Sequence, residues 1–114
     1  MEKIKSALGT DHLRVVGAGE RSIRKVALCG GSGASLLGEA VRQGADVLVT
    51  GDVKYHEAQS ARSRGLALVD AGHFATERLM VPEIARLLRE AAVQKSWNLK
   101  VSEDAGDADP FRVV

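Results

Sequence analysis

The residues best suited to chemistry lie in segment 70–77, which reads Asp-Ala-Gly-His-Phe-Ala-Thr-Glu. His73 and Glu77 are four residues apart, so a helix beginning here places both side chains on one face. An imidazole and a carboxylate are ligand types that divalent transition metals accept in proteins. Two ligands are only half of such a set, so the spacing predicts part of a metal site. In the alternative interpretation, local hydrogen bonds satisfy His73, and Asp70 and Thr76 are turn or capping groups.

A second group of reactive side chains follows an apolar run at 51–56. Asp52, Lys54 and His56 bring a carboxylate, an ammonium and an imidazole close together in the sequence. Such a group can tune pKa values and transfer protons, which makes the three residues candidates for catalysis. In the alternative interpretation, Asp52 caps a helix while Lys54 and His56 face solvent.

A glycine-rich run, Gly30-Gly31-Ser32-Gly33, precedes a predicted helix. Exposed backbone amides and the helix dipole at such a place can hold an anion, so the four residues are candidates for substrate binding. The run lacks the Lys-Ser/Thr ending of a Walker loop and the full Gly-x-Gly-x-x-Gly spacing. A tight turn with close packing is the alternative interpretation.

Short apolar runs alternate with helical patterns along the chain. The apolar runs predict strands at 13–16, 26–29, 47–50 and 66–69, with two further strands at 99–101 and 110–114. Helical periodicity predicts helices at 35–43, 56–64 and 74–95, the last kinked or restarted at Pro82.

The second, third and fourth apolar runs are continuous rather than alternating, which is typical of strands buried on both faces. The sequence therefore predicts an α/β fold, with a mostly parallel sheet and helices on both faces. Ligands of such sheets gather at the carboxyl ends of the strands. We expect the loops 30–33, 51–56 and 70–77 to lie together at that edge.

Length and composition predict a single domain over residues 1–114. The net charge of +1 gives no electrostatic case for nucleic acid or an anionic membrane. Cys29 is the only cysteine, which excludes an intrachain disulfide, and its apolar neighbours predict a buried structural thiol. No apolar run approaches the ~20 residues of a membrane span, so a cytoplasmic protein is expected.

Three segments of the chain resemble, in their order and spacing, a known protein family. They are residues 26–33, 44–56 and 70–77, and the closing Asp109-Pro110-Phe111 resembles that family's C-terminus. The chain is similar, from about Leu13 onward, to the C-terminal half of the NGG-interacting-factor-three-like family. Members of this family carry the name GTP cyclohydrolase 1 type 2 homologue.

The resemblance implies half of a larger two-part fold that holds two divalent metal ions (zinc, manganese or iron) within ring-like homo-oligomers. His73 and Glu77 match the family's C-terminal ligands, whereas a His-His pair and an aspartate come from its N-terminal half. The histidines of this chain are His12, His56 and His73, so it has no His-His pair. We therefore expect the N-terminal half to be absent and the isolated chain to be inactive.

Three functional hypotheses follow from these observations. In the first, the chain is the C-terminal part of a metal-dependent, hydrolase-like protein, which a separate N-terminal half or other copies of the chain would accompany. In the second, it is a metal-free binding or assembly module that has kept the fold without the chemistry. In the third, it is a nucleotide-binding regulatory domain that uses the glycine run 30–33.

Overall fold

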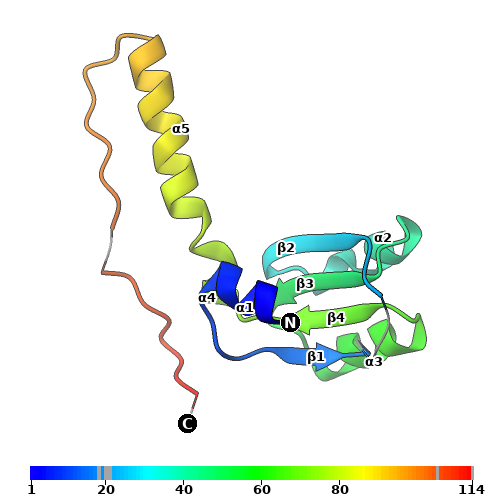
Figure 1. Ribbon diagram of the computed structural model, residues 1–114. Helices are drawn as coiled ribbons and strands as arrows, with labels where there is room; N and C mark the ends of the chain where they lie inside the picture. Colours follow the sequence, from blue (N-terminus) through cyan, green and yellow to red (C-terminus); the bar gives the residue numbers. More distant parts are fainter. Residues whose placement is uncertain (18, 20–21, 105, 114) are drawn as a thin grey trace.

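Helices lie on both faces of a central sheet, and one long helix extends away from it (Figure 1). The computed structural model describes residues 1–17, 19, 22–104 and 106–113. The elements in chain order are α1 (Glu2–Leu8), β1 (Arg14–Val16), β2 (Val26–Ser32), the 3₁₀ turn η1 (Ala34–Leu36), α2 (Leu37–Arg42), β3 (Val47–Gly51), α3 (Tyr55–Ser63), β4 (Ala67–Asp70), α4 (His73–Glu77) and α5 (Met80–Gln94).

The sheet formed by the described residues has the strand order β1-β4-β3-β2. Strands β2, β3 and β4 are parallel, and β1 pairs antiparallel with β4, so that Arg14 lies opposite Asp70. Helices α2 and α3 connect the parallel strands, since parallel neighbours need a crossover between them. The predicted α/β fold is confirmed; the sheet is mixed because β1 joins its edge in the opposite direction.

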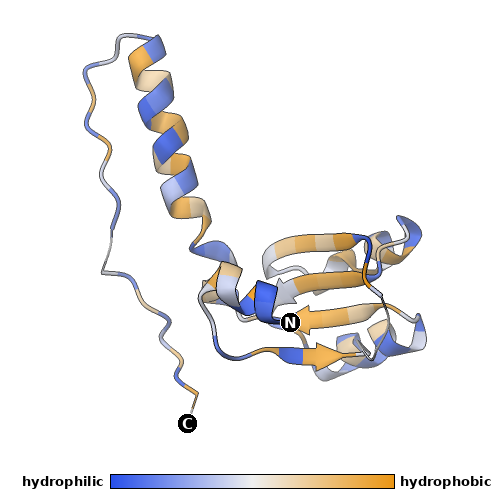
Figure 2. Cartoon of the chain, in the orientation of Figure 1, coloured by the Kyte–Doolittle hydropathy of each residue, from blue (hydrophilic) through white to orange (hydrophobic). Residues whose placement is uncertain are grey.

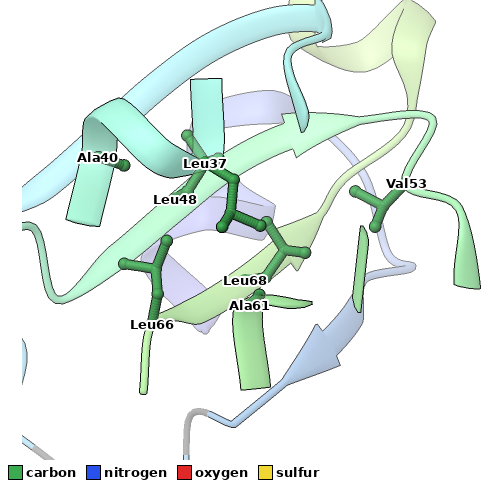
Figure 3. Close-up of a cluster of buried hydrophobic side chains, with 7 residues drawn as sticks. All are labelled: Leu37, Ala40, Leu48, Val53, Ala61, Leu66 and Leu68. Atoms are coloured by element: carbon green, nitrogen blue, oxygen red, sulfur yellow. The ribbon is translucent and has the colours of Figure 1, made fainter. Parts of the chain in front are cut away.

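The strands of the sheet are largely apolar (Figure 2), and both faces of the central strands β3 and β4 are covered. On one face, the side chains of Leu48 and Leu68 pack against α2 and α3 (Figure 3). On the other face, Val47, Val49 and Val69 pack against the half-buried apolar residues of α1. Burial on both sides explains why β3 and β4 are continuous apolar runs in the sequence.

The boundaries of several elements differ from the sequence-based expectation. Strand β2 continues to Ser32, so most of the glycine run belongs to the strand rather than to a turn after it. The helix expected at 35–43 begins as the 3₁₀ turn η1. The segment 74–95 divides into α4 and α5, with Pro82 in the first turn of α5, where a missing N–H donor costs little.

Two further expectations are wrong for the described residues. No strand forms at 99–101 or 110–113, because this tail runs beside α5, away from the sheet edges that could pair with it (Figure 1); Val114 lies outside the described residues. Cys29 is half-buried rather than buried, because β2 is an edge strand. None of the described helices has the length and apolar character needed to cross a membrane.

The packing of the core predicts that Leu68 and Leu28 differ strongly in their contribution to the free energy of unfolding. Replacing Leu68, which is 1% exposed, with alanine leaves a cavity beneath α3, and we expect it to lower the free energy of unfolding by about 2.5–5 kcal/mol. Urea unfolding followed by circular dichroism measures the loss. The control is Leu28→Ala on the open face of β2, where the side chain is 76% exposed and the expected change is below about 0.5 kcal/mol. Equal losses would contradict this packing.

Candidate functional site

The carboxyl ends of β2, β3 and β4 meet at one edge of the sheet, where α4 packs against β2 and β3. His73 is the first residue of α4 and Glu77 the last, so both belong to this edge. Asp52 follows β3 directly and reaches the same place. The structure therefore brings together one predicted catalytic residue and both predicted metal ligands.

The imidazole of His73 lies between two carboxylates. Its Nδ1 atom is 2.6 Å from Oδ2 of Asp52, and its Nε2 atom is 3.0 Å from Oε2 of Glu77. All three side chains are about half exposed, so the group is open to solvent and solutes. The expected placement of His73 and Glu77 on one face of a helix is present in α4.

These two carboxylates raise the pKa of His73 above its usual value. The hydrogen bond to Asp52 is the largest cause, desolvation opposes it, and the charges of Glu77 and Asp52 add to the rise. Protonated imidazole donates from both ring nitrogens, one to each carboxylate. A proton on Nε2 thus lies between His73 and Glu77.

Asp52 adopts an unusual backbone conformation at this edge. Its φ is +55°, in the left-handed region that aspartate tolerates better than most residues. The alternative interpretation of Asp52 as the cap of the following helix is wrong, because Lys54 precedes α3 and its backbone N–H donates to the Glu57 carboxylate at 2.7 Å. The Asp52 carboxylate is turned toward His73 instead.

Glycines allow α4 to approach the sheet closely. A Cβ atom on Gly31, whose φ is +60°, would lie 2.2 Å from Oε1 of Glu77 and 3.2 Å from Cε1 of His73. A Cβ atom on Gly51 would lie 2.8 Å from the backbone nitrogen of His73. His73 and Glu77 can therefore lie against the strands only because these positions lack side chains.

Two threonines that sequence reasoning missed fasten this approach. The Thr76 hydroxyl accepts the Gly31 N–H at 2.9 Å, which ties α4 to β2. The fully buried Thr50 hydroxyl accepts the Gly33 N–H at 2.8 Å and donates to the Gly31 carbonyl at 2.9 Å. A threonine inside the otherwise apolar run of β3 was the available signal, because a buried hydroxyl requires partners.

These contacts give the glycine run 30–33 a packing role, as in its alternative interpretation. Gly30 and Gly31 lie under α4, and Gly33 fits against Cys29 and Thr50. Substrate binding by Gly30, Gly31, Ser32 and Gly33 stays a prediction.

Asp70 holds together the loops that carry the site. Its carboxylate accepts the backbone N–H of Gly72 at 3.1 Å and of Val53 at 3.2 Å. The same carboxylate forms an ion pair with Arg14 at 3.0 Å, and the Arg14 guanidinium also donates to the Val53 carbonyl. The loops after β3 and β4, which present Asp52 and His73, are thereby fixed to each other and to β1.

Lys54 and His56 lie apart from this group. Lys54 precedes α3, and the His56 ring on α3 is exposed, 3.3 Å through Nδ1 from Oε1 of Gln59 and edge-on to Tyr55. Neither side chain belongs to the groove that contains Asp52 and His73. Their roles in proton transfer stay predictions.

The residues at this edge suit part of a metal site. His73 and Glu77 offer nitrogen and oxygen donors within 3.0 Å of each other, and Asp52 holds Nδ1 in the way carboxylates support metal-bound histidines. In the described part of the chain, no group of three or more histidine, cysteine, aspartate or glutamate side chains is arranged to hold a metal ion. The donor chemistry thus fits a partial ligand set.

The fold and this edge define a mixed α/β domain that presents an imidazole and a carboxylate beside the ends of its parallel strands. The model of the family Duf34/NIF3 (NGG1p interacting factor 3) matches residues 1–110. The chain belongs to this family, which confirms the resemblance found in the sequence.

Similar proteins support the same assignment. The chain is 38% identical over 117 residues to a GTP cyclohydrolase 1 type 2 homolog of Streptococcus pneumoniae, covering 99% of this chain and 44% of that protein. The crystal structure of Staphylococcus aureus protein SA1388 matches with a TM-score of 0.91 and 36% identity, over 99% of this chain and 36% of that one. A Bacillus cereus protein related to NIF3 matches with the same TM-score and 38% identity, over 99% of this chain and 31% of that one. The chain thus spans less than half the length of these relatives.

Substitution of two glycines with similar backbone angles distinguishes the effect of backbone strain from the effect of steric crowding. Gly31→Ala and Gly44→Ala both place alanine at positive φ, and we expect each to lower the free energy of unfolding by about 1–2 kcal/mol. Gly44 has open space around it, whereas a methyl group at Gly31 displaces the Glu77 carboxylate. We therefore expect only Gly31→Ala to shift the NMR signals of the His73 ring. An unchanged His73 spectrum in that variant would contradict the close approach of α4.

Asp52 and Glu77 both raise the pKa of His73, and we expect Asp52 to have the larger effect. Replacing Asp52 with asparagine removes the largest cause of the increase, so the pKa of His73 falls toward its usual value. Glu77→Gln also lowers it, by less. NMR titration of the His73 ring measures both changes: the ring keeps its proton to higher pH in the wild type than in either variant. A larger decrease in Glu77→Gln than in Asp52→Asn would contradict the geometry.

Proposed function

We propose that this chain is one part of a dinuclear-metal, hydrolase-like NIF3 protein and supplies His73 and Glu77 as metal ligands. The observation that carries the proposal is the 3.0 Å approach of His73 Nε2 to Glu77 Oε2, with Nδ1 held by Asp52. Imidazole nitrogen and carboxylate oxygen together suit zinc, manganese or iron. The remaining ligands come from an N-terminal part of the fold.

Each residue of this group has a defined task in the proposal. His73 gives up the Nε2 proton and presents that nitrogen as a ligand, while Glu77 provides a carboxylate oxygen beside it. Asp52 accepts the Nδ1–H, which keeps the ring in the required tautomer and orientation. A divalent metal held by these residues would supply Lewis acidity and would lower the pKa of a water molecule for hydrolysis. The names of the similar proteins motivate a cyclohydrolase-type activity, with the substrate left open.

A metal-free assembly module is the second candidate, and one observation favours it. Large apolar side chains on α5 and in the tail are exposed, including Leu88 at 46% and Phe111 at 86%. Exposed apolar surface of this kind marks contacts with other polypeptides. In this alternative the chain forms homo-oligomers, and His73 and Glu77 take no part.

Metal titration separates the two candidates. We expect the chain to bind Zn²⁺ or Mn²⁺ weakly in calorimetry, because two ligands are fewer than a closed site needs. His73→Ala and Glu77→Gln should each weaken binding at least tenfold, whereas His56→Ala, the matched change of a histidine outside the group, leaves the affinity unchanged. Binding should also weaken as the pH falls through the raised pKa of His73, because the metal and the proton compete for Nε2.

The result that would reject the first candidate is equally specific. Tight, stoichiometric metal binding that persists in His73→Ala would mean that other residues form the site. Absence of detectable binding by the chain, both alone and with an N-terminal half supplied, would leave the assembly module as the function.

A further inference from the structure

A small cavity, which we call the α3 cavity, lies between strand β1 and the first turn of α3. Its volume is about 270 Å³, and residues of β1, β4 and α3 form its walls. It is separate from the groove that contains His73 and Glu77, although Arg14, Val53 and Asp70 line both spaces. An occupant of the α3 cavity therefore contacts the same ion pair that fixes the loops of the site.

The pairing of β1 with β4 divides the floor of the α3 cavity into a charged part and an apolar part. Arg14 lies opposite Asp70, and two residues further along β1, Val16 lies opposite Leu68. Side chains two residues apart on a strand share one face of the sheet, here the face that α3 covers. A ligand in the cavity therefore meets charge at one end and hydrocarbon at the other.

The apolar part of the cavity can accept a small hydrophobic body. Val53 and Leu68 are almost fully buried in the core (Figure 3), and Val16 and Ala58 are half-buried beside them. Ala58 contributes only a methyl group to the α3 wall, which leaves room that a larger side chain would fill. Because the volume of about 270 Å³ lies just below the roughly 300–1,000 Å³ of sites for drug-sized ligands, the ligand has the size of about one ring.

Tyr55 adds an aromatic surface to the rim of the α3 cavity. The residue is 73% exposed, yet two neighbours on α3 hold its ring in place. The Gln59 amide donates to the phenol oxygen at 3.3 Å, and the His56 ring lies edge-on, with 5.6 Å between the ring centroids. A tyrosine held in this way can stack on a planar ligand with little further loss of conformational freedom.

Lys54 gives the α3 cavity a net positive charge. The lining contains two cations, Arg14 and Lys54, and one anion, Asp70. Arg14 is paired with Asp70 at 3.0 Å, whereas Lys54 forms no ion pair with any residue that the structure describes. The nearby Glu57 carboxylate accepts the Lys54 backbone N–H and does not line the cavity. An anionic ligand can therefore pair with Lys54 without displacing a carboxylate of the protein.

We propose that the α3 cavity is a binding site for a small aromatic anion, meaning one ring that carries a carboxylate or a phosphate. The ring lies over Val16 and Ala58 and stacks on Tyr55, while the anionic group pairs with Lys54. The site goes beyond the proposed function, because none of these residues is a proposed metal ligand and binding requires no metal.

The experiment titrates the chain with matched small molecules in EDTA and follows the backbone amide signals by NMR. Benzoate and phenyl phosphate carry both ring and charge, benzamide has the ring of benzoate without its charge, and acetate has the charge without the ring. We expect at least one aryl anion to bind at least threefold more tightly than benzamide and tenfold more tightly than acetate, with shifts at Val16, Tyr55 and Ala58. The tighter of the two aryl anions identifies the preferred anionic group.

Two variants and one control test the assigned residues. Lys54→Gln removes the charge and should weaken binding of the aryl anion at least threefold, whereas Lys100→Gln, the same substitution in the exposed tail, should leave it unchanged. Ala58→Leu fills the apolar part without a change of charge and should weaken binding at least tenfold. Circular dichroism verifies folding, and Lys54→Gln, at an exposed position, decides the question if Ala58→Leu destabilises the domain.

Three outcomes would overturn the proposal. They are equal affinities for benzoate, phenyl phosphate and benzamide, binding that neither Lys54→Gln nor Ala58→Leu weakens, and absence of binding by both aryl anions up to about 10 mM. Because the titration excludes metal, failure of metal binding at His73 and Glu77 would reject the proposed function and leave this site standing.

Discussion

The close approach of α4 to the ends of β2 and β3 is the constraint on which the rest of the site depends. Gly31 and Gly51 leave no room for side chains at the two points of contact, and the Thr76 hydroxyl locks the helix to the Gly31 amide. This approach sets His73 beside Asp52, which comes from a different loop, and leaves Glu77 over Gly31. Because Gly31 and Gly51 carry no side chains, the imidazole and the carboxylates can lie close together at this edge of the sheet.

The three parallel strands and the helical pairing of His73 with Glu77 could be predicted from the sequence, because apolar runs and four-residue spacing are local signals. The contact of Asp52 with His73 could not, since it joins residues 21 positions apart through a left-handed backbone angle at Asp52. The two expected strands of the tail failed for a similar reason. Leu99 and Val101 have a strand-like composition, but a strand also needs an edge to pair with, and no local pattern reports one.

The molecule divides into a well-packed sheet and an extended arm made of α5 and the tail. The sheet buries its leucines and valines on both faces, whereas α5 stabilises its polar side with ion pairs around Arg86 and leaves its apolar side open. Exposed ion pairs of this type contribute little to stability. The two regions therefore differ in what holds them: apolar burial for the sheet, and mainly helical hydrogen bonds and exposed ion pairs for the arm.

The surface position of Asp52, His73 and Glu77 also indicates whether folding of this domain needs these three residues. In small zinc-finger domains the metal is the core, and the polypeptide is unfolded without it. Here the core is Leu48, Leu68 and their neighbours, and the three polar side chains hold one another in place at the rim. The scaffold can therefore form without a cation, and under the proposed function the cation would be acquired after folding, in exchange for a single proton on His73.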